Sequence, residues 1–240
     1  NGRSGFFLAI AGEMLFFALA SAQRIKDIFS EAEQMKTGVY KQQLETEQVI
    51  NYFTASISDK NNIDELMWDV VKNCISKLGF EDCVIYLADD EQKILTQKAA
   101  WGPKTKEENK ITNPLKIPFG SGIVGHVARN DKAEIIADTT LDERYIADDA
   151  SRPSEICVPI SYNGKVLGVI DSEHSQKNFY TERHLQILTT IASLVANRIV
   201  IIKAEEMAKQ KEIEVLKLKA SNFQYQLEIE QVINFFASSI

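Results

Sequence analysis

The pattern of hydrophobic and polar positions predicts helices at both ends of the chain and a strand-rich region between them. Residues 26–57 keep a helical pattern with interspersed charges. In residues 63–79 apolar side chains recur at spacings of three and four, which predicts an amphipathic helix. Asn62 suits its N-cap and Gly79 its C-cap. A second long helix is predicted from Thr181 to the end of the chain.

In the central region, apolar and polar residues alternate as they do in β-strands. The Asn163–Gly164 pair is a strong signal for a hairpin turn, and Ser121 is placed to cap a short helix. The predicted fold is α+β, an antiparallel sheet with helices on one face, flanked by long helices that form coiled coils and by the end of a transmembrane helix. The predicted strands are DCVIYLAD (82–89), KILTQKAAWG (93–102), AEIIAD (133–138) and the hairpin SEICVPISYNGKVLGVIDSEH (154–174).

One fifteen-residue segment occurs twice. QLETEQVINYFTASI spans residues 43–57 and QLEIEQVINFFASSI spans residues 226–240, with eleven identical positions at an offset of 183. That offset is about one domain plus a linker helix, so each copy is expected to be a connector helix that leads into a module. The second copy therefore predicts that another module starts at 227–240.

The last predicted helix carries a heptad pattern after it leaves the central region. Apolar residues at spacings of three and four are typical of a coiled-coil seam, and we expect a parallel homodimer through this helix. Packing of a solvated helix on its own domain is the alternative. The seam residues are Ile213, Leu216, Ala220, Phe223 and Leu227.

An apolar run at the start of the chain predicts a membrane contact. Residues 5–22 are apolar except for Glu13 and small polar residues, and their length is close to what a bilayer requires. Arg24 and Lys26 follow, which places the rest of the chain in the cytoplasm by the positive-inside rule. A buried soluble helix and a signal anchor remain alternatives. The stretch GEMLFFALASAQRIK resembles the last membrane helix of bacterial seven-transmembrane receptors.

The composition of the chain limits which classes of function we expect. The net charge of −7 argues against nucleic-acid binding. The three cysteines form no CxxC pair, which favours free thiols over a disulfide framework or a zinc site. The chain begins with Asn1 and ends within a helical pattern, so we expect it to be part of a longer protein.

The central region carries a set of motif positions: Gly120-x-Gly122-x-x-Gly125, Asp138, Pro159, Gly164, Gly168 and Phe179. Together they resemble a GAF domain over residues 61–200. This resemblance implies a sensory or regulatory module whose ligand lies between the sheet and two loops, at about 103–126 and 139–154. It does not specify the ligand or a cofactor.

Seven residues are candidates for contact with a small ligand in such a pocket. For several of them a structural role is the alternative: His126 on the helix surface, Tyr145 as a loop anchor and Arg152 paired with a neighbouring acid. The candidates are Trp101, His126, Tyr145, Asp149, Arg152, Glu155 and His174.

Departures from the motifs of GAF relatives argue against several specific ligands and activities. Lys177-Asn178-Phe179 has the wrong order for a cyclic-nucleotide motif, and residues 139–154 lack a cysteine for a bilin. The stretch YIADDASRPSEICVPI resembles the free methionine sulfoxide reductases, but Asp148 or Asp149 stands where their reactive cysteine would be. No metal site and no enzymatic activity are therefore expected in this segment.

The predicted function is a sensory module of a membrane-anchored signalling protein, with an output such as a histidine kinase. The alternatives are a ligand-free dimerisation spacer and a small-metabolite enzyme related to the free methionine sulfoxide reductases. The predicted division is 1–23 for the end of the membrane region, 24–60 for a connector helix, 61–200 for the GAF domain, 201–226 for a coiled-coil linker and 227–240 for a second module.

Overall fold

The computed structural model describes residues 2–89, 91–102, 110–111, 113–146 and 151–238. It separates into two units, residues 1–49 and 50–240, and the second contains the sheet. The elements are α1 (Gly2–Ser58), α2 (Ile63–Leu78), β1 (Cys83–Asp89), β2 (Ile94–Trp101), β3 (Lys116–Pro118), α3 (Gly122–Asn130), β4 (Glu134–Ile136), a 3-10 turn (Thr139–Leu141), β5 (Ser154–Tyr162), β6 (Lys165–His174) and α4 (Glu182–Ala237).

The six strands form one sheet in the order β3-β2-β1-β6-β5-β4, and every neighbouring pair is antiparallel. This confirms the predicted α+β fold with an antiparallel sheet. The hairpin between β5 and β6 turns at Asn163 and Gly164, which both have positive φ as a type I′ turn requires. Strand β3 was not predicted, because three residues are too few to show an alternation.

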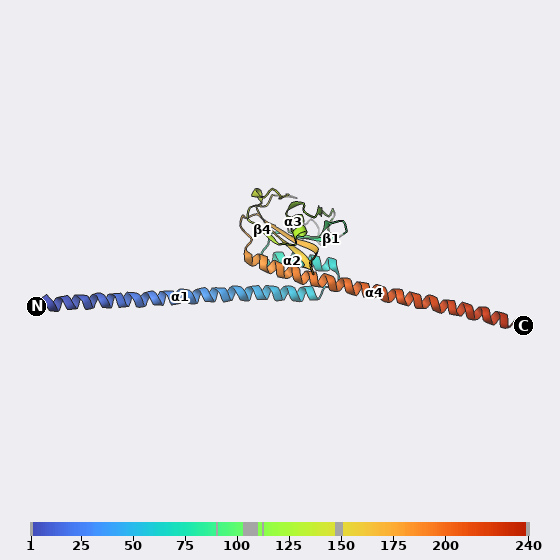
Figure 1. Ribbon diagram of the computed structural model, residues 1–240, viewed down its shortest axis with the longest axis horizontal. Helices are drawn as coiled ribbons and strands as arrows, with labels where there is room; N and C mark the ends of the chain where they lie inside the picture. Colours follow the sequence, from blue (N-terminus) through green and yellow to red (C-terminus); the bar gives the residue numbers. More distant parts are fainter. Residues whose placement is uncertain (1, 90, 103–109, 112, 147–150, 239–240) are drawn as a thin grey trace. The chain divides into compact units, whose positions relative to one another are not determined.

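The sheet is covered on both faces. The long helices α2 and α4 lie along one face (Figure 1), where Ile85, Ile156 and Ile170 are fully buried. The short helix α3 covers the opposite face, where Val124 and Val127 pack with the core around Tyr86. The prediction placed the helices on one face; α3 is the exception, and it builds the roof of the site described below.

Helix α2 shows why this sequence folds as predicted. The Asn62 side chain accepts hydrogen bonds from the amides of Asp64 and Glu65, which satisfies donors that the first helical turn leaves open. Gly79 closes the helix in the left-handed conformation at a φ of 70°. Such conformations suit glycine because a Cβ would add strain.

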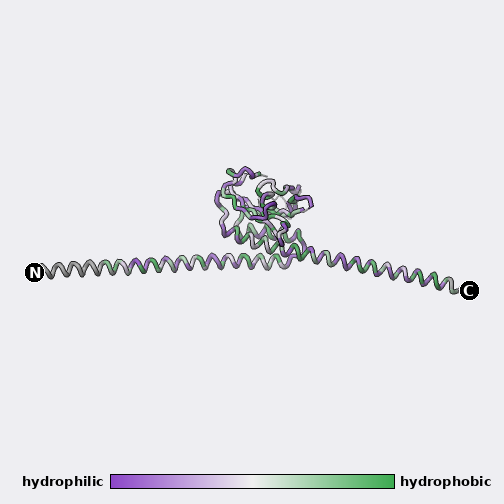
Figure 2. The backbone as a smooth tube through the Cα atoms, in the orientation of Figure 1, coloured by the Kyte–Doolittle hydropathy of each residue, from purple (hydrophilic) through white to green (hydrophobic). Residues whose placement is uncertain are grey.

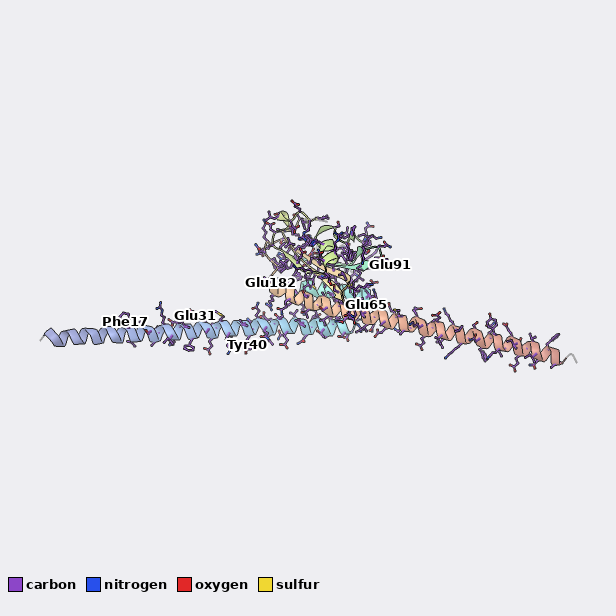
Figure 3. The ribbon with its side chains drawn as sticks, in the orientation of Figure 1. Phe17, Glu31, Tyr40, Glu65, Glu91 and Glu182 are labelled. Atoms are coloured by element: carbon purple, nitrogen blue, oxygen red, sulfur yellow. The ribbon has the colours of Figure 1, made fainter. Side chains whose placement is uncertain are left out.

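One helix among the described residues is long and apolar enough to cross a membrane, and it lies within α4. Its apolar part packs on the sheet, since Leu188, Ile191 and Val195 are fully buried, so the core explains its composition. Beyond the domain, hydrophobic and hydrophilic residues alternate along α4 (Figure 2). Along α1, the side chains of Phe17 and Tyr40 project outward from the helix (Figure 3).

Candidate functional site

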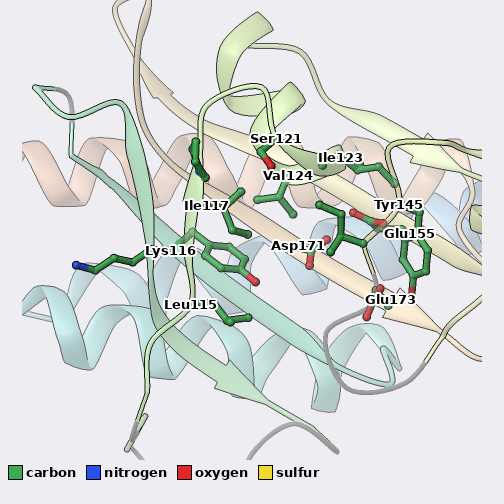
Figure 4. A pocket seen from close by; sticks show the side chains of 14 residues that line it. Leu115, Lys116, Ile117, Ser121, Ile123, Val124, Tyr145, Glu155, Asp171 and Glu173 are labelled. Atoms are coloured by element: carbon green, nitrogen blue, oxygen red, sulfur yellow. The ribbon is translucent and has the colours of Figure 1, made fainter.

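A cavity of about 330 Å³ lies over the sheet face that α3 covers (Figure 4). Its walls come from residues 115–124 and from Tyr145 and Ile146, which belong to the two loops expected to cover the sheet. The floor comes from β1, β5 and β6. Apolar side chains make most of the wall: Tyr86, Leu115, Ile117, Pro118, Ile123, Val124 and Ile146.

The floor of the cavity carries three carboxylates. Glu155 on β5 and Asp171 and Glu173 on β6 are each at most 5% exposed, and all three line the cavity. Glu155 lies directly opposite Glu173 in the register of the two strands. Like charges in this position destabilise a sheet, so the arrangement has a local cost.

The buried charges around the cavity do not balance. Among the described residues, four buried carboxylates, with Asp82 as the fourth, stand against one buried guanidinium, an excess of three formal negative charges. Arg152 places its Nη1 3.2 Å from Glu173 Oε2 and 3.8 Å from Asp82 Oδ2. Arg152 therefore compensates part of this negative charge, and Lys116 is a second cation in the cavity lining.

Tyr145 joins the covering loop to this charged cluster. Its hydroxyl accepts a hydrogen bond from the Arg152 amide at 3.0 Å. Burial raises the pKa of Tyr145 to about 12, and the nearby carboxylates of Glu173 and Glu155 act in the same direction. The phenol therefore stays neutral at physiological pH and holds the loop over the cavity.

Gly125 sets how closely α3 approaches the cavity wall. A Cβ at this position would overlap the Pro118 carbonyl oxygen and lie 3.1 Å from the Gly120 amide nitrogen. The Gly120 amide also donates a 2.6 Å hydrogen bond to the Gly125 carbonyl. Gly125 is therefore required for the tight turn that precedes α3.

Replacing Gly125 with alanine is expected to displace α3 from the wall and to lower the free energy of unfolding by about 1–3 kcal/mol, as overpacking does. Urea unfolding followed by tryptophan fluorescence measures the loss. Gly38, whose Cβ would meet nothing within 4 Å, is the matched control. Equal unfolding midpoints for the two alanine variants would contradict this account of α3.

His126, a predicted ligand residue, belongs to an ionic cluster outside the cavity lining. Its Nδ1 lies 2.8 Å from Glu134 Oε1 and 2.7 Å from Arg144 Nη1. Arg144 also bonds Asp142 through two nitrogens, at 3.0 and 2.7 Å. Hydrogen bonds from Arg144 hold the pKa of Asp142 below its ordinary value. The cluster joins α3 and β4 to the loop that carries Tyr145.

The structure brings two of the seven predicted ligand residues, Tyr145 and Glu155, to the cavity lining. Arg152 lies behind that lining, paired with Glu173. Trp101 ends β2 with the Lys72 ammonium 4.6 Å from its ring centroid, and the ring of His174 stacks on that of Phe179 at 3.5 Å. Asp149 lies outside the described residues.

Sequence reasoning missed Tyr86, Asp171 and Glu173 as lining residues. A signal for the two acids was present: they lie two residues apart in a predicted strand and so share one face, and two acids on the inward face of a core strand are unusual. The position of Glu173 opposite Glu155 depends on a register shift in the hairpin, between Ile160 and Ser161, which the sequence pattern does not reveal.

The three cysteines of the chain are buried and free. Burial raises the pKa of Cys157 well above its ordinary value, and the carboxylates of Asp171 and Glu155 add to this effect. Burial likewise raises the pKa of Cys83. These groups are therefore thiols rather than thiolates at neutral pH, and a thiol is a poor nucleophile.

Comparison with known proteins identifies a matching family model and several similar proteins. The sequence model described as a GAF domain matches residues 60–200. Protein YtsP of Bacillus subtilis is 32% identical over 148 residues, which cover 62% of this chain and 77% of YtsP.

Two solved structures show the same fold at 20% identity. The GAF domain of a phosphoenolpyruvate-protein phosphotransferase from Coxiella burnetii superposes with a TM-score of 0.62, over 68% of this chain and 98% of that one. The free methionine-R-sulfoxide reductase of Neisseria meningitidis, solved in complex with its substrate, superposes with a TM-score of 0.59 over 68% of this chain and 91% of that one.

Proposed function

Because the chain belongs to the GAF domain family, we propose that it is a sensory module that binds a small ammonium-bearing metabolite in the cavity over its sheet. The observation that carries this proposal is the set of three buried carboxylates on the cavity floor, with Glu155 directly opposite Glu173. An ammonium group placed among them would donate charge-assisted hydrogen bonds to carboxylate oxygens where negative charge is concentrated.

The rest of the cavity suits a ligand with an apolar body and an anionic end. Leucine, isoleucine and valine side chains line the wall. Ser121, Gly122 and Ile123 at the start of α3 also line the cavity, and the amides of a first helical turn favour negative charge. Amino acids with apolar side chains combine these three properties. The Neisseria relative is named for free methionine sulfoxide, which is also a free amino acid, although its side chain is polar.

The proposal is one of binding and signalling rather than catalysis. The chemistry that reduces a sulfoxide requires a reactive thiolate, whereas Cys74, Cys83 and Cys157 are buried. We therefore expect no turnover of free methionine sulfoxide, even if that compound binds.

Hydrogen bonds extend from the charged cluster toward α4. Asp82 Oδ1 accepts from the Glu173 amide at 2.7 Å, and Ser172 Oγ donates to the Asp82 carbonyl at 2.5 Å. The same Ser172 hydroxyl lies 2.7 Å from the Tyr180 hydroxyl, two residues before α4 begins. A ligand that shifts β6 would therefore change contacts at the start of α4, and it can shift the equilibrium only by its difference in affinity for the two arrangements.

We further propose that the module belongs to a membrane-anchored signal-transduction protein with its GAF domain in the cytoplasm. Residues 5–22 would be the membrane anchor, supported by their apolar composition and by Arg24 and Lys26 after them. The exposed part of α4 would carry the signal as one helix of a homodimer to an output such as a histidine kinase.

A thermal-shift screen tests the ligand proposal. At a ligand concentration about one hundred times the Kd, the midpoint of thermal unfolding is expected to rise by about 5–10 °C. Amino acids with apolar side chains should produce this shift, while their deaminated acids should not. A flat response across amines, amino acids and nucleotides would overturn the proposal and favour a ligand-free dimerisation spacer.

If the chain forms this homodimer, positively charged residues in the seam should prevent dimerisation. Leu216 and Phe223 are 58% and 63% exposed in the single chain, and lysine at both positions is expected to abolish dimerisation. Sedimentation equilibrium measures the state. Val215 and Leu218, exposed to a similar extent on another face, provide the matched lysine control. Loss of the dimer in the control alone would show that the seam is wrongly assigned.

A further inference from the structure

Both copies of the repeated segment contain the same residues on one face of a helix. The structure shows what this face contacts in the first copy. Within residues 50–57 of α1, Phe53 and Ile57 are buried while Ile50 and Ser56 are half-buried. The other residues of this stretch are exposed. These four residues form the docking face, which follows the spacing of three and four of a helix that packs on one side.

The docking face of the first copy packs on α2. The Ser56 hydroxyl donates to the Asp69 carboxylate, and the Lys60 ammonium lies 3.2 Å from the same side chain. The Tyr52 hydroxyl donates to Asn73 Oδ1 at 2.8 Å from the edge of the face. Together with the buried Phe53, these contacts fix the end of α1 on the helical layer of the domain.

The second copy preserves the docking face and varies the outward side. The docking residues Ile50, Phe53, Ser56 and Ile57 all recur unchanged at the offset of 183. The three differences in this stretch, at Tyr52, Thr54 and Ala55, fall on exposed positions. Within residues 50–57 all four docking positions are identical in the two copies, whereas Asn51 is the one exposed position that is also kept. This difference supports the same mode of packing for the second copy.

Ile233 is the docking residue of the second copy whose side chain the structure describes, and it is 60% exposed. The apolar residues Ile229 and Val232 beside it are 60% and 54% exposed. The proposed dimer seam does not cover it, because continuing the heptads beyond Leu227 leads to Glu230 and Asn234, which are polar. The seam therefore ends where the second copy begins, and a different surface must cover the apolar residues.

We propose that the second copy is a docking helix for the helical layer of another domain of the GAF fold. The partner surface would offer an α2-like helix with an apolar recess for the counterparts of Phe53 and Ile57 and an acceptor for the counterpart of Ser56. Phe235 replaces Tyr52 and has no hydroxyl, so the partner needs no acceptor in the place of Asn73. This inference is independent of the ligand.

A fusion protein tests it. Residues 58–200 are appended directly after Ile240, which keeps the register because 58 plus 183 is 241. The amides of residues 229–235 are expected to exchange with deuterium about tenfold or more slowly than in the unfused chain. Ile233→Asp, on the docking face, should remove this protection, whereas Asn234→Asp, on the outward side, should keep it. Equal exchange in the fused and unfused chains overturns the proposal.

A second measurement uses the chain itself, in case the appended domain does not fold. Four substitutions, Thr46→Ile, Tyr52→Phe, Thr54→Ala and Ala55→Ser, convert the first copy into the second. Amides of residues 53–57 are expected to exchange within about threefold of their original rates, because the docking face is unchanged. A rise of tenfold or more would show that the second copy does not fit such a surface.

Discussion

Replacing Arg152 with alanine is expected to lower the free energy of unfolding by about 3–5 kcal/mol, because it leaves buried carboxylates without their cation. Arg152 is 5% exposed, and its guanidinium lies within 4 Å of both Glu173 and Asp82. Urea unfolding followed by tryptophan fluorescence measures the change.

Two variants accompany the Arg152 measurement. Arg152→Lys keeps the positive charge and should lose less stability than Arg152→Ala. Lys132 is exposed and its alanine variant should match the original protein. An unfolding midpoint for Arg152→Ala equal to that of the Lys132 variant would show that Arg152 does not compensate the buried acids.

The paired substitutions Glu155→Gln and Asp171→Asn are expected to separate stability from binding. Both keep the shape of the side chain and remove a negative charge from the cavity floor. Without ligand, relief of the repulsion between Glu155 and Glu173 should stabilise the domain by up to about 1 kcal/mol. Affinity for the ammonium ligand should fall about one hundredfold, because charge-assisted hydrogen bonds are lost.

Urea unfolding and isothermal titration calorimetry measure these two effects on the same protein. Ser161 is half-buried at the turn end of the hairpin and lies outside the cavity lining, so Ser161→Ala is a control that should leave affinity unchanged. If the double variant binds the ligand as tightly as the original protein, these carboxylates do not recognise the ligand. A double variant that is less stable would show that the acids serve the fold rather than a ligand.

The helices and strands could be predicted because local chemistry determines them. Asn62 and Gly79 begin and end α2 as expected, and the Asn163–Gly164 turn forms the hairpin. The docking of α1 was also within reach, since the apolar positions of the repeat share one helix face. Short strands such as β3 form through pairing with β2, and local sequence does not encode that pairing.

The acidic floor could not be predicted from the turn alone. Pairing outward from Asn163–Gly164 gives Tyr162 opposite Lys165, and the same register would put Ser172 opposite Glu155. The register shift between Ile160 and Ser161 instead brings Glu173 opposite Glu155. A shift of one residue moves every later side chain to the other face, so this bulge decides which acids line the cavity.

Some of the predicted ligand residues line the cavity and others do not, for a related reason. Tyr145 and Glu155 line the cavity. His126 lies on the same short helix as two lining residues, but helix α3 presents Ile123 and Val124 to the cavity and places His126 against Glu134. The helical period separates these residues, and the bounds of α3 are needed to know which face is inward.

The most direct test of the account compares the affinities of two ligands that differ only in the ammonium group. An amino acid that raises the unfolding temperature is titrated into the domain by calorimetry, alongside the acid that lacks its amine. The account predicts that the amino acid binds at least about one hundredfold more tightly, and that the difference disappears in the Glu155→Gln/Asp171→Asn variant. Equal affinities for the two compounds would contradict recognition of an ammonium group by the carboxylates of this cavity.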